Sequence, residues 1–166
     1  MRQIVSNTGP VLHLLEIGSL GLLQFAGEVR IPYAVDRELN GLMPDWPTQR
    51  PVWLNRAEVA PAGLQQTQSW LDAGDIHAGE AAALALARQV NAAWFLTDDT
   101  AARLIARTIG LEVHGSLGLV LWAAATRHLD RDQAARRLEN LASSSLWVSP
   151  RILTEARAAL SQLYPG

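Results

Sequence analysis

Side chains that carry oxygen follow two short apolar segments with the pattern of β-strands. Asn7 comes directly after the segment 4–6, and Asp98 and Asp99 come directly after the segment 93–97. In an open α/β sheet, sites form beyond the carboxyl ends of the strands. We therefore expect these three side chains to lie close together if the two strands are neighbours, where their oxygen atoms could surround one hard cation.

Two acidic residues on predicted helices could join this group. Glu38 lies in a helix that is entered from the second predicted strand, and Glu80 lies early in the helix with the strongest pattern. The residues around Glu80 are small and apolar, so burying its carboxylate there is costly unless a cation accompanies it.

Each of these residues, taken alone, also suits a purely structural role. The residues at the strand ends suit helix caps. Glu38 suits a solvated helix face, with Asp36 as a nearby competitor for any functional role, and Glu80 suits a first helical turn. Capping and metal binding do not exclude each other, because both place oxygen atoms at the ends of strands.

The elements that must position these residues alternate between strand and helix. Strands are predicted at residues 4–6, 28–31, 53–59, 93–97 and 111–113. Helices are predicted at residues 10–17, 20–25, 32–42, 63–71, 76–90, 98–109, 116–127, 130–141 and 149–163, with a loop at 43–51. This alternation predicts a three-layer α/β fold, with a central, mostly parallel sheet and helices on both faces.

Composition narrows the class of protein further. The chain has 166 residues, of which 49% are hydrophobic and 18% charged, so we expect a single domain over 1–166 without long solvated tails. The absence of cysteine excludes disulfides, thiolate zinc sites and cysteine nucleophiles. The sequence starts without the apolar core of a signal peptide and contains no apolar run of membrane-spanning length, so we expect a cytoplasmic protein.

Four segments, in this order, resemble the PIN domain family. They are IVSNTGP at 4–10, IPYAVDREL at 31–39, GEAAALALA at 79–87 and LTDDTAAR at 96–103. The later segment GLEVHGSLG at 110–118 also fits, so the likeness extends over nearly the whole chain. It is greatest to the VapC-like branch of bacterial and archaeal PIN proteins.

The resemblance implies a PIN-like fold and a metal-dependent endoribonuclease, which could be the toxin of a type II toxin–antitoxin system. The catalytic and metal-binding residues that it implies are Asn7, Glu38, Glu80 and Asp99, with Asp98 as a further metal ligand. Oxygen ligands match Mg²⁺ or Mn²⁺ and argue against zinc or iron. The net charge of −2 is compatible with this function, because RNA would be met through cations bound at the acidic site.

Neighbouring residues complete the expected site. Thr8 and Thr97 are expected to orient metal-bound water or a phosphate from behind the ligands. Arg103 is expected to pair with Asp99 or to face solvent, with binding of a substrate phosphate as the alternative. His77 lies three residues before Glu80, but a surface role is the favoured interpretation.

Asn7 departs from the general PIN pattern, which has an aspartate at this place. An amide oxygen carries no negative charge, so metal affinity should fall. Three interpretations stay open: a variant natural to the VapC-like branch, a change that inactivates a toxic protein, and a module that has lost catalysis and acts by binding RNA or protein.

The resemblance also implies a homodimer and a small antitoxin protein as partners, with the apolar helices after Gly115 as the expected dimer surface. Trp94 is expected in the core, whereas Trp46 and Trp53 flank a proline-rich loop and could stack on a base, although packing is favoured. A receiver-like signalling domain is a poor alternative, because it requires a lysine and the chain has none.

Overall fold

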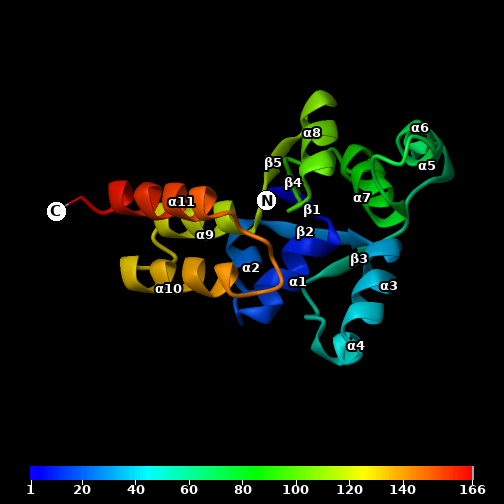
Figure 1. The fold of residues 1–166 in the computed structure, drawn as a ribbon. Coiled ribbons are helices and arrows are strands. Elements are labelled where there is room, and N and C mark those ends of the chain that lie inside the picture. Colours follow the sequence, from blue (N-terminus) through cyan, green and yellow to red (C-terminus); the bar gives the residue numbers. More distant parts are fainter. Residues whose placement is uncertain (166) are drawn as a thin grey trace.

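Five parallel strands form one sheet in the computed structural model, which describes residues 1–165. The strands are β1 (Gln3–Ser6), β2 (Glu28–Pro32), β3 (Asn55–Ala57), β4 (Trp94–Leu96) and β5 (Glu112–His114). Their order is β3-β2-β1-β4-β5, so β1 lies at the centre between β2 and β4 (Figure 1). Every pairing is parallel, which confirms the predicted α/β fold.

Helices cover both faces of this sheet. The chain forms α1 (Thr8–Glu16), α2 (Leu22–Ala26), α3 (Tyr33–Leu42), α4 (Trp46–Gln49), α5 (Pro61–Gln66), α6 (Gln68–Asp72), α7 (Ala78–Gln89), α8 (Thr100–Thr108), α9 (Ser116–Ala125), α10 (Arg131–Ala142) and α11 (Pro150–Leu163). One face is covered by α1, α2 and α3, and the other by α7 and α8 (Figure 1). The direction in which successive strands are added to the sheet reverses at β1. Because the connections are right-handed, the helices before this reversal cover one face and the helices after it cover the other.

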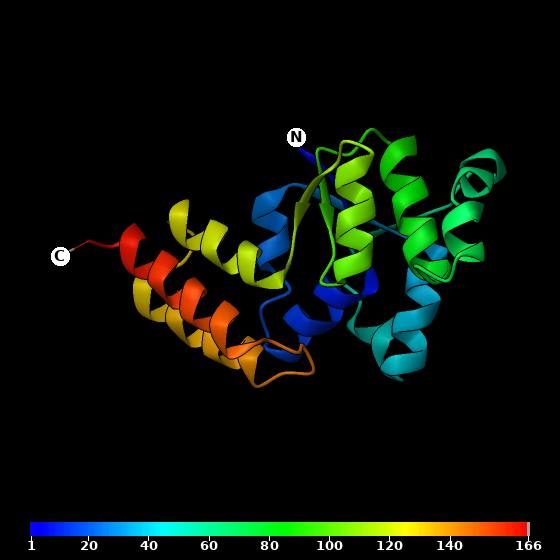
Figure 2. The same cartoon turned by 45° about the horizontal axis from the view of Figure 1, so that its top comes forward.

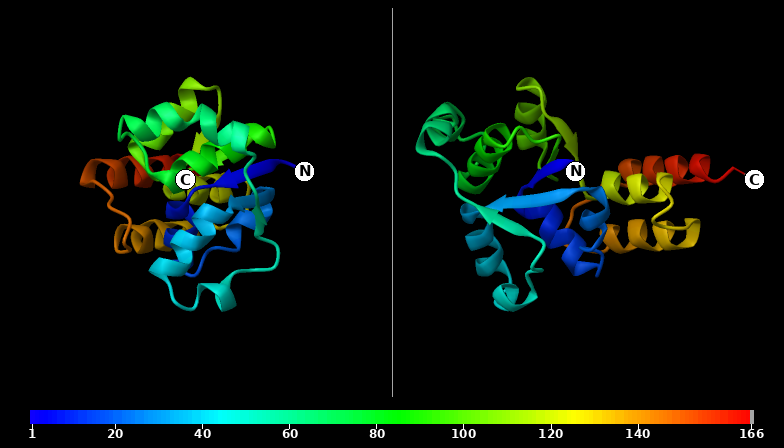
Figure 3. Two further views of the ribbon diagram at one scale, coloured as in Figure 1. Left: turned by 90° about the vertical axis from the view of Figure 1, so that its right-hand side faces the viewer. Right: turned by 180° about the vertical axis from the view of Figure 1, so that it is seen from behind.

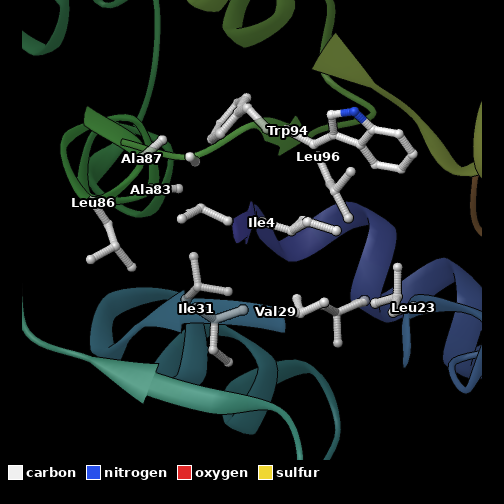
Figure 4. Packing of buried hydrophobic residues seen from close by; sticks show 14 of the residues in the cluster. Ile4, Leu23, Val29, Ile31, Ala83, Leu86, Ala87, Trp94 and Leu96 are labelled. Carbon is white, nitrogen blue, oxygen red and sulfur yellow. The ribbon is translucent and has the colours of Figure 1, made fainter. Parts of the chain in front are cut away.

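The core lies where α7 packs against the central strands. Ile4 of β1 and Ile31 of β2 are fully buried, and their side chains lie between the strands and the small residues Ala83 and Ala87 of α7 (Figure 4). Small residues on α7 let the helix approach the sheet closely, and each large aliphatic side chain buried there contributes about 1.5–3 kcal/mol. Trp94 is also buried, as predicted.

A second apolar cluster joins α9, α10 and α11. These three helices pack together and extend away from the sheet toward the C-terminus (Figures 2 and 3). Val120, Leu138 and Leu160 are among its buried residues. The hydroxyl of Tyr164 closes the far end of the cluster by donating to the carbonyl of Leu129 at 2.8 Å.

Two local predictions differ from the structure, whereas the favoured packing of Trp46 and Trp53 is confirmed. The predicted loop at 43–51 contains the short helix α4, because Trp46 is buried (1% exposed) and its Nε1 donates to Asp36 Oδ1 at 2.8 Å. Trp46 is therefore not available to stack on a base, and Trp53 is partly buried against the main core. The predicted helix at 63–71 is divided at Thr67, whose hydroxyl donates to the carbonyl of Leu64.

No helix within residues 1–165 is long and apolar enough to cross a membrane.

Candidate metal centre

The turns after β1 and β4 lie side by side. Ser6 pairs with Leu96 in the register of the two strands, and the backbone N–H of Asn7 donates to the carbonyl of Leu96 at 2.8 Å. This confirms that Asn7 and the residues after β4 meet at one edge of the sheet. The site forms at the carboxyl ends of the central strands, where the strand order reverses.

Asn7 caps α1 and contacts the β4 turn at the same time. It is buried (4% exposed), and its Oδ1 accepts from the backbone N–H of Thr8 at 2.9 Å. Its Nδ2 donates to the hydroxyl of Thr97 at 3.3 Å, and the same hydroxyl accepts from the backbone N–H of Asp99 at 3.1 Å. Thr97 therefore fixes both the amide of Asn7 and the start of the turn that carries Asp99.

Glu38 is held between the first turns of α1 and α7. The hydroxyl of Thr8 donates to Glu38 Oε2 at 2.5 Å. A β-carbon built on Gly79 would overlap the carboxylate of Glu38, so the side chain of Glu38 can lie there only because residue 79 is glycine. The packing of α3 against α7 thus places Glu38, which lies in the connection between β2 and β3, at the sheet edge where Asn7 lies.

Glu80 lies in the first turn of α7 and is almost fully buried (6% exposed). Its Oε2 accepts from the backbone N–H of His77 at 3.1 Å, which completes a capping box at the start of the helix. Burial raises the pKa of the Glu80 carboxyl above its usual range, and the charges of Asp99 and Glu38 raise it further, whereas His77 lowers it. Asp99 and Glu38 are therefore close enough to Glu80 for their charges to act on its carboxyl group.

His77 lies in the site, contrary to the favoured surface interpretation. Its Nδ1 is 3.2 Å from Glu38 Oε1, and its Nε2 is 3.3 Å from Glu80 Oε1. The imidazole thus lies between two of the carboxylates, although its side chain is 57% exposed. The signal available in the sequence was its place directly before a helix, but histidine is not one of the preferred capping residues.

Asp98 and Asp99 point to different partners. Asp99 caps α8 by accepting from the backbone N–H of Ala102 at 2.8 Å. Asp98 accepts from the backbone N–H of Ser116 at 2.7 Å and from its hydroxyl at 2.5 Å, and its Oδ2 is 2.7 Å from His13 Nδ1. Asp98 therefore ties β4 to α1 and to the start of α9, and both of its oxygens are occupied.

Asn7, His77, Glu80 and Asp99 line a pocket of about 330 Å³, and Glu38 lies beside it in contact with His77. Arg103 lines an adjoining hollow whose lining does not include Asp99. Its guanidinium donates to the carbonyl of Thr97 at 3.3 Å, and within residues 1–165 it forms no ion pair with Asp99. Of the two favoured roles of Arg103, pairing with Asp99 or facing solvent, the ion pair is not formed, and the side chain is partly buried.

The side-chain oxygens of Asn7, Glu38, Glu80 and Asp99 suit a hard divalent cation, but the imidazole of His77 lies between two of the carboxylates. Among the residues that the structure describes, no three acidic or histidine side chains are arranged to hold a metal ion as they stand. Burial is the main cause of the raised pKa of Glu80, and the charges of Asp99 and Glu38 add to it, so a divalent cation beside Glu80 would favour the charged carboxylate. The imidazole of His77 lies between Glu38 and Glu80, so a cation held by both carboxylates would either displace it or take it as a further ligand.

A comparison with known families covers the residues of this site. Residues 3–162 match a family model described as "DUF3368: PIN domain". The matched range extends from β1 into α11, so it includes every residue of the pocket. No curated protein matches the sequence.

Proposed function

The chain belongs to the PIN domain family, a superfamily of nucleases, and we propose on that basis that it is an endoribonuclease that uses Mg²⁺ or Mn²⁺. The observation that carries the proposal is the convergence of Asn7, Glu80 and Asp99 on one pocket, with Glu38 beside them. These residues come from four separate segments of the chain, and their shared feature is a side-chain oxygen directed at the end of the central strands.

In the proposed mechanism, Glu38, Glu80 and Asp99 would hold the cation, which when bound would lower the pKa of a water and offset negative charge on the phosphate. Thr8 holds the carboxylate of Glu38 in place. Thr97 orients the amide of Asn7 and the turn that carries Asp99. Positioning of this kind keeps the ligands from turning away and so raises metal affinity.

Asp98 has a different part in this proposal from the one expected. Because its oxygens already accept from Ser116 and lie against His13, we assign it to positioning the turn after β4. Its neighbour Asp99 keeps one carboxylate oxygen without a hydrogen bond to the backbone of α8, which leaves an oxygen for the cation.

The proposal extends to the biological role that the sequence resemblance implied. A VapC-like toxin of a type II toxin–antitoxin system would act on RNA, form a homodimer and be blocked by a small antitoxin protein. What supports this role is the likeness of the four motifs to that branch, and the apolar helices α9 to α11 are the proposed dimer surface.

The test is cleavage of a labelled RNA by the purified protein in Mn²⁺. We expect cleavage that is abolished by EDTA and reduced on the order of 100-fold or more by Glu80→Gln or Asp99→Asn, because metal-bound water contributes most of the chemistry. Glu155→Gln is the matched control, since Glu155 is exposed on α11 and pairs with Arg151. Equal activity of all four proteins would rule out this pocket as the catalytic site.

A second candidate function is a PIN-fold module that binds RNA or protein without cutting it. Two observations favour it: the neutral amide of Asn7 where the family pattern has a carboxylate, and the imidazole of His77 between Glu38 and Glu80. Calorimetric titration with Mn²⁺ separates the two functions, because a module without catalysis should show no saturable metal site.

A further inference from the structure

A groove runs from the acidic pocket along α8. It has a volume of about 540 Å³, and its lining includes Arg103, Arg107 and Trp147. We call it the α8 groove. Asp98, Thr100, Leu146 and Trp147 line both the groove and the acidic pocket, so the two hollows adjoin each other.

The α8 groove carries positive charge beside a site of negative charge. Arg103 and Arg107 are one helical turn apart, so they project from the same side of α8. In the described part of the chain, neither forms an ion pair with a carboxylate. The acidic residue in the lining is Asp98, whose oxygens are already held by Ser116.

Trp147 is the most exposed aromatic side chain of the described residues, at 84%. It lies in the segment between α10 and α11, which returns to the end of α1 (Figure 1). The backbone N–H of Ser145 donates to Glu16 Oε2 at 2.9 Å, and the hydroxyl of Ser145 donates to the same carboxylate. The loop is therefore anchored two residues before an indole that contacts water over most of its surface, so a ligand that stacks on this indole loses little entropy to ordering it.

We infer that the α8 groove binds a single-stranded segment of RNA, with phosphates at Arg103 and Arg107 and a base stacked on Trp147. The inference rests on the proposed function, since the strand that reaches the groove is the one whose phosphate occupies the acidic pocket. Guanidinium groups match phosphates in charge and geometry, and an exposed indole matches the face of any base. A duplex keeps its bases paired inside the helix, so the groove selects unpaired RNA.

Binding is measured with the cleavage chemistry removed. Every protein carries Glu80→Gln and is kept in EDTA, and the probe is a fluorescein-labelled single-stranded RNA of 12 nucleotides followed by anisotropy. We expect Trp147→Ala to weaken binding roughly 10-fold and Trp147→Phe to retain affinity within about 3-fold, because a phenyl ring still stacks. Since Trp147 and Arg107 are both exposed, loss of folding does not explain the result.

The arginines are tested by salt dependence. Arg107→Ala should lower the slope of log Kd against log salt by about 0.7, the contribution of one phosphate contact on a single strand. Arg88→Ala is the matched control, because Arg88 is exposed at the end of α7 away from the groove. Its slope should equal that of the parent.

The outcomes separate this inference from the proposed function when cleavage by the wild-type and Trp147→Ala proteins is assayed in parallel in Mn²⁺. If RNA binding is unchanged in the Trp147 and Arg107 variants, the inference that the α8 groove binds RNA is wrong. Cleavage by the wild-type protein in the same experiment would still support the proposed nuclease function. Absence of any RNA binding, or equal affinity for an RNA duplex, also overturns the groove. Trp147-dependent binding without cleavage in any metal supports the groove and overturns the nuclease.

Discussion

The carboxylate of Glu38 occupies the space that a β-carbon on residue 79 would need. Gly79 lies in the first turn of α7, one residue before Glu80, so the missing side chain at 79 lets an acid from α3 lie against the helix that carries the next acid. The obstructed group is the end of a flexible side chain, so a larger residue at 79 would displace Glu38 without disturbing the backbone.

Gly79→Ala should therefore lower the affinity for Mn²⁺ by about 10-fold or more while the protein stays folded. Alanine is the better helix former by up to about 1 kcal/mol, so the melting temperature should hold or rise. Titration calorimetry and thermal unfolding measure the two effects. Gly41→Ala is the control, because Gly41 lies on α3 with open space around it. Unchanged Mn²⁺ affinity in Gly79→Ala would show that Glu38 is not a ligand.

Asn7→Asp should strengthen Mn²⁺ binding by about 10-fold or more. A full negative charge about 4 Å from a cation gains about 4 kcal/mol for each unit of cation charge at the effective dielectric of a protein surface, and desolvation removes part of that gain. The aspartate still caps α1, because its oxygen can accept from the backbone N–H of Thr8.

The same variant should be less stable than wild type in EDTA, since it adds a carboxylate near Glu80 and Asp99. Melting curves with and without Mn²⁺ test this: the rise in melting temperature caused by the metal should be larger for Asn7→Asp. An equal rise in both proteins would mean that residue 7 does not face the cation.

The raised pKa of Glu80 makes the stability of the metal-free protein depend on pH. Because the folded-state pKa lies above that of the unfolded chain, the stabilising contribution is fully present below the unfolded-state value near 4.5 and is lost as the pH rises through the folded-state value. Glu80→Gln, which keeps an oxygen for the backbone N–H of His77, should therefore gain stability over wild type with rising pH.

Chemical denaturation in EDTA across pH 4 to pH 8 (on the order of one measurement per pH unit) gives this difference directly. Glu155→Gln serves again as the control, because its exposed carboxyl is remote from the pocket. Parallel pH profiles for wild type and Glu80→Gln would contradict the electrostatic environment described for Glu80.

The role assigned to Asp98 predicts an effect on stability. Asp98→Asn removes a charged acceptor that serves Ser116 and His13 in a buried place, which should cost about 2–3 kcal/mol of unfolding free energy. The folded fraction should still show a saturable Mn²⁺ site, with affinity about 10-fold below wild type, because Asp98 positions the turn that carries Asp99. Asp132→Asn, on the exposed face of α10, is the control. A loss of metal binding without a loss of stability would restore Asp98 as a ligand.

The sequence predicted the sheet and the meeting of Asn7 with the residues after β4, because both follow from strand patterns and the rule for parallel sheets. It could not separate Asp98 from Asp99, since adjacent residues share the same pattern. What separates them is Ser116, eighteen residues later in the chain, which takes up the oxygens of Asp98. Asp99 is left to cap α8.

His77 and Trp147 show a second limit of prediction. The place of His77 depends on how closely α3 packs on α7, which Gly79 permits and no local pattern reveals. The place of Trp147 depends on an anchor between Ser145 and Glu16, which are 129 residues apart in the sequence. Contacts of this kind arise from tertiary packing between distant segments, so the secondary-structure propensities of the sequence cannot predict them.

The position of β1 at the centre of the sheet has a consequence for synthesis on the ribosome. Asn7 and Glu38 are translated before β4, which begins at Trp94 and pairs with the other edge of β1. Asp99, which follows β4, is translated later still. A nascent chain shorter than that cannot assemble the cation pocket, however well its first half folds. Under the proposed function, catalytic competence would thus be withheld until Asp99 has left the exit tunnel.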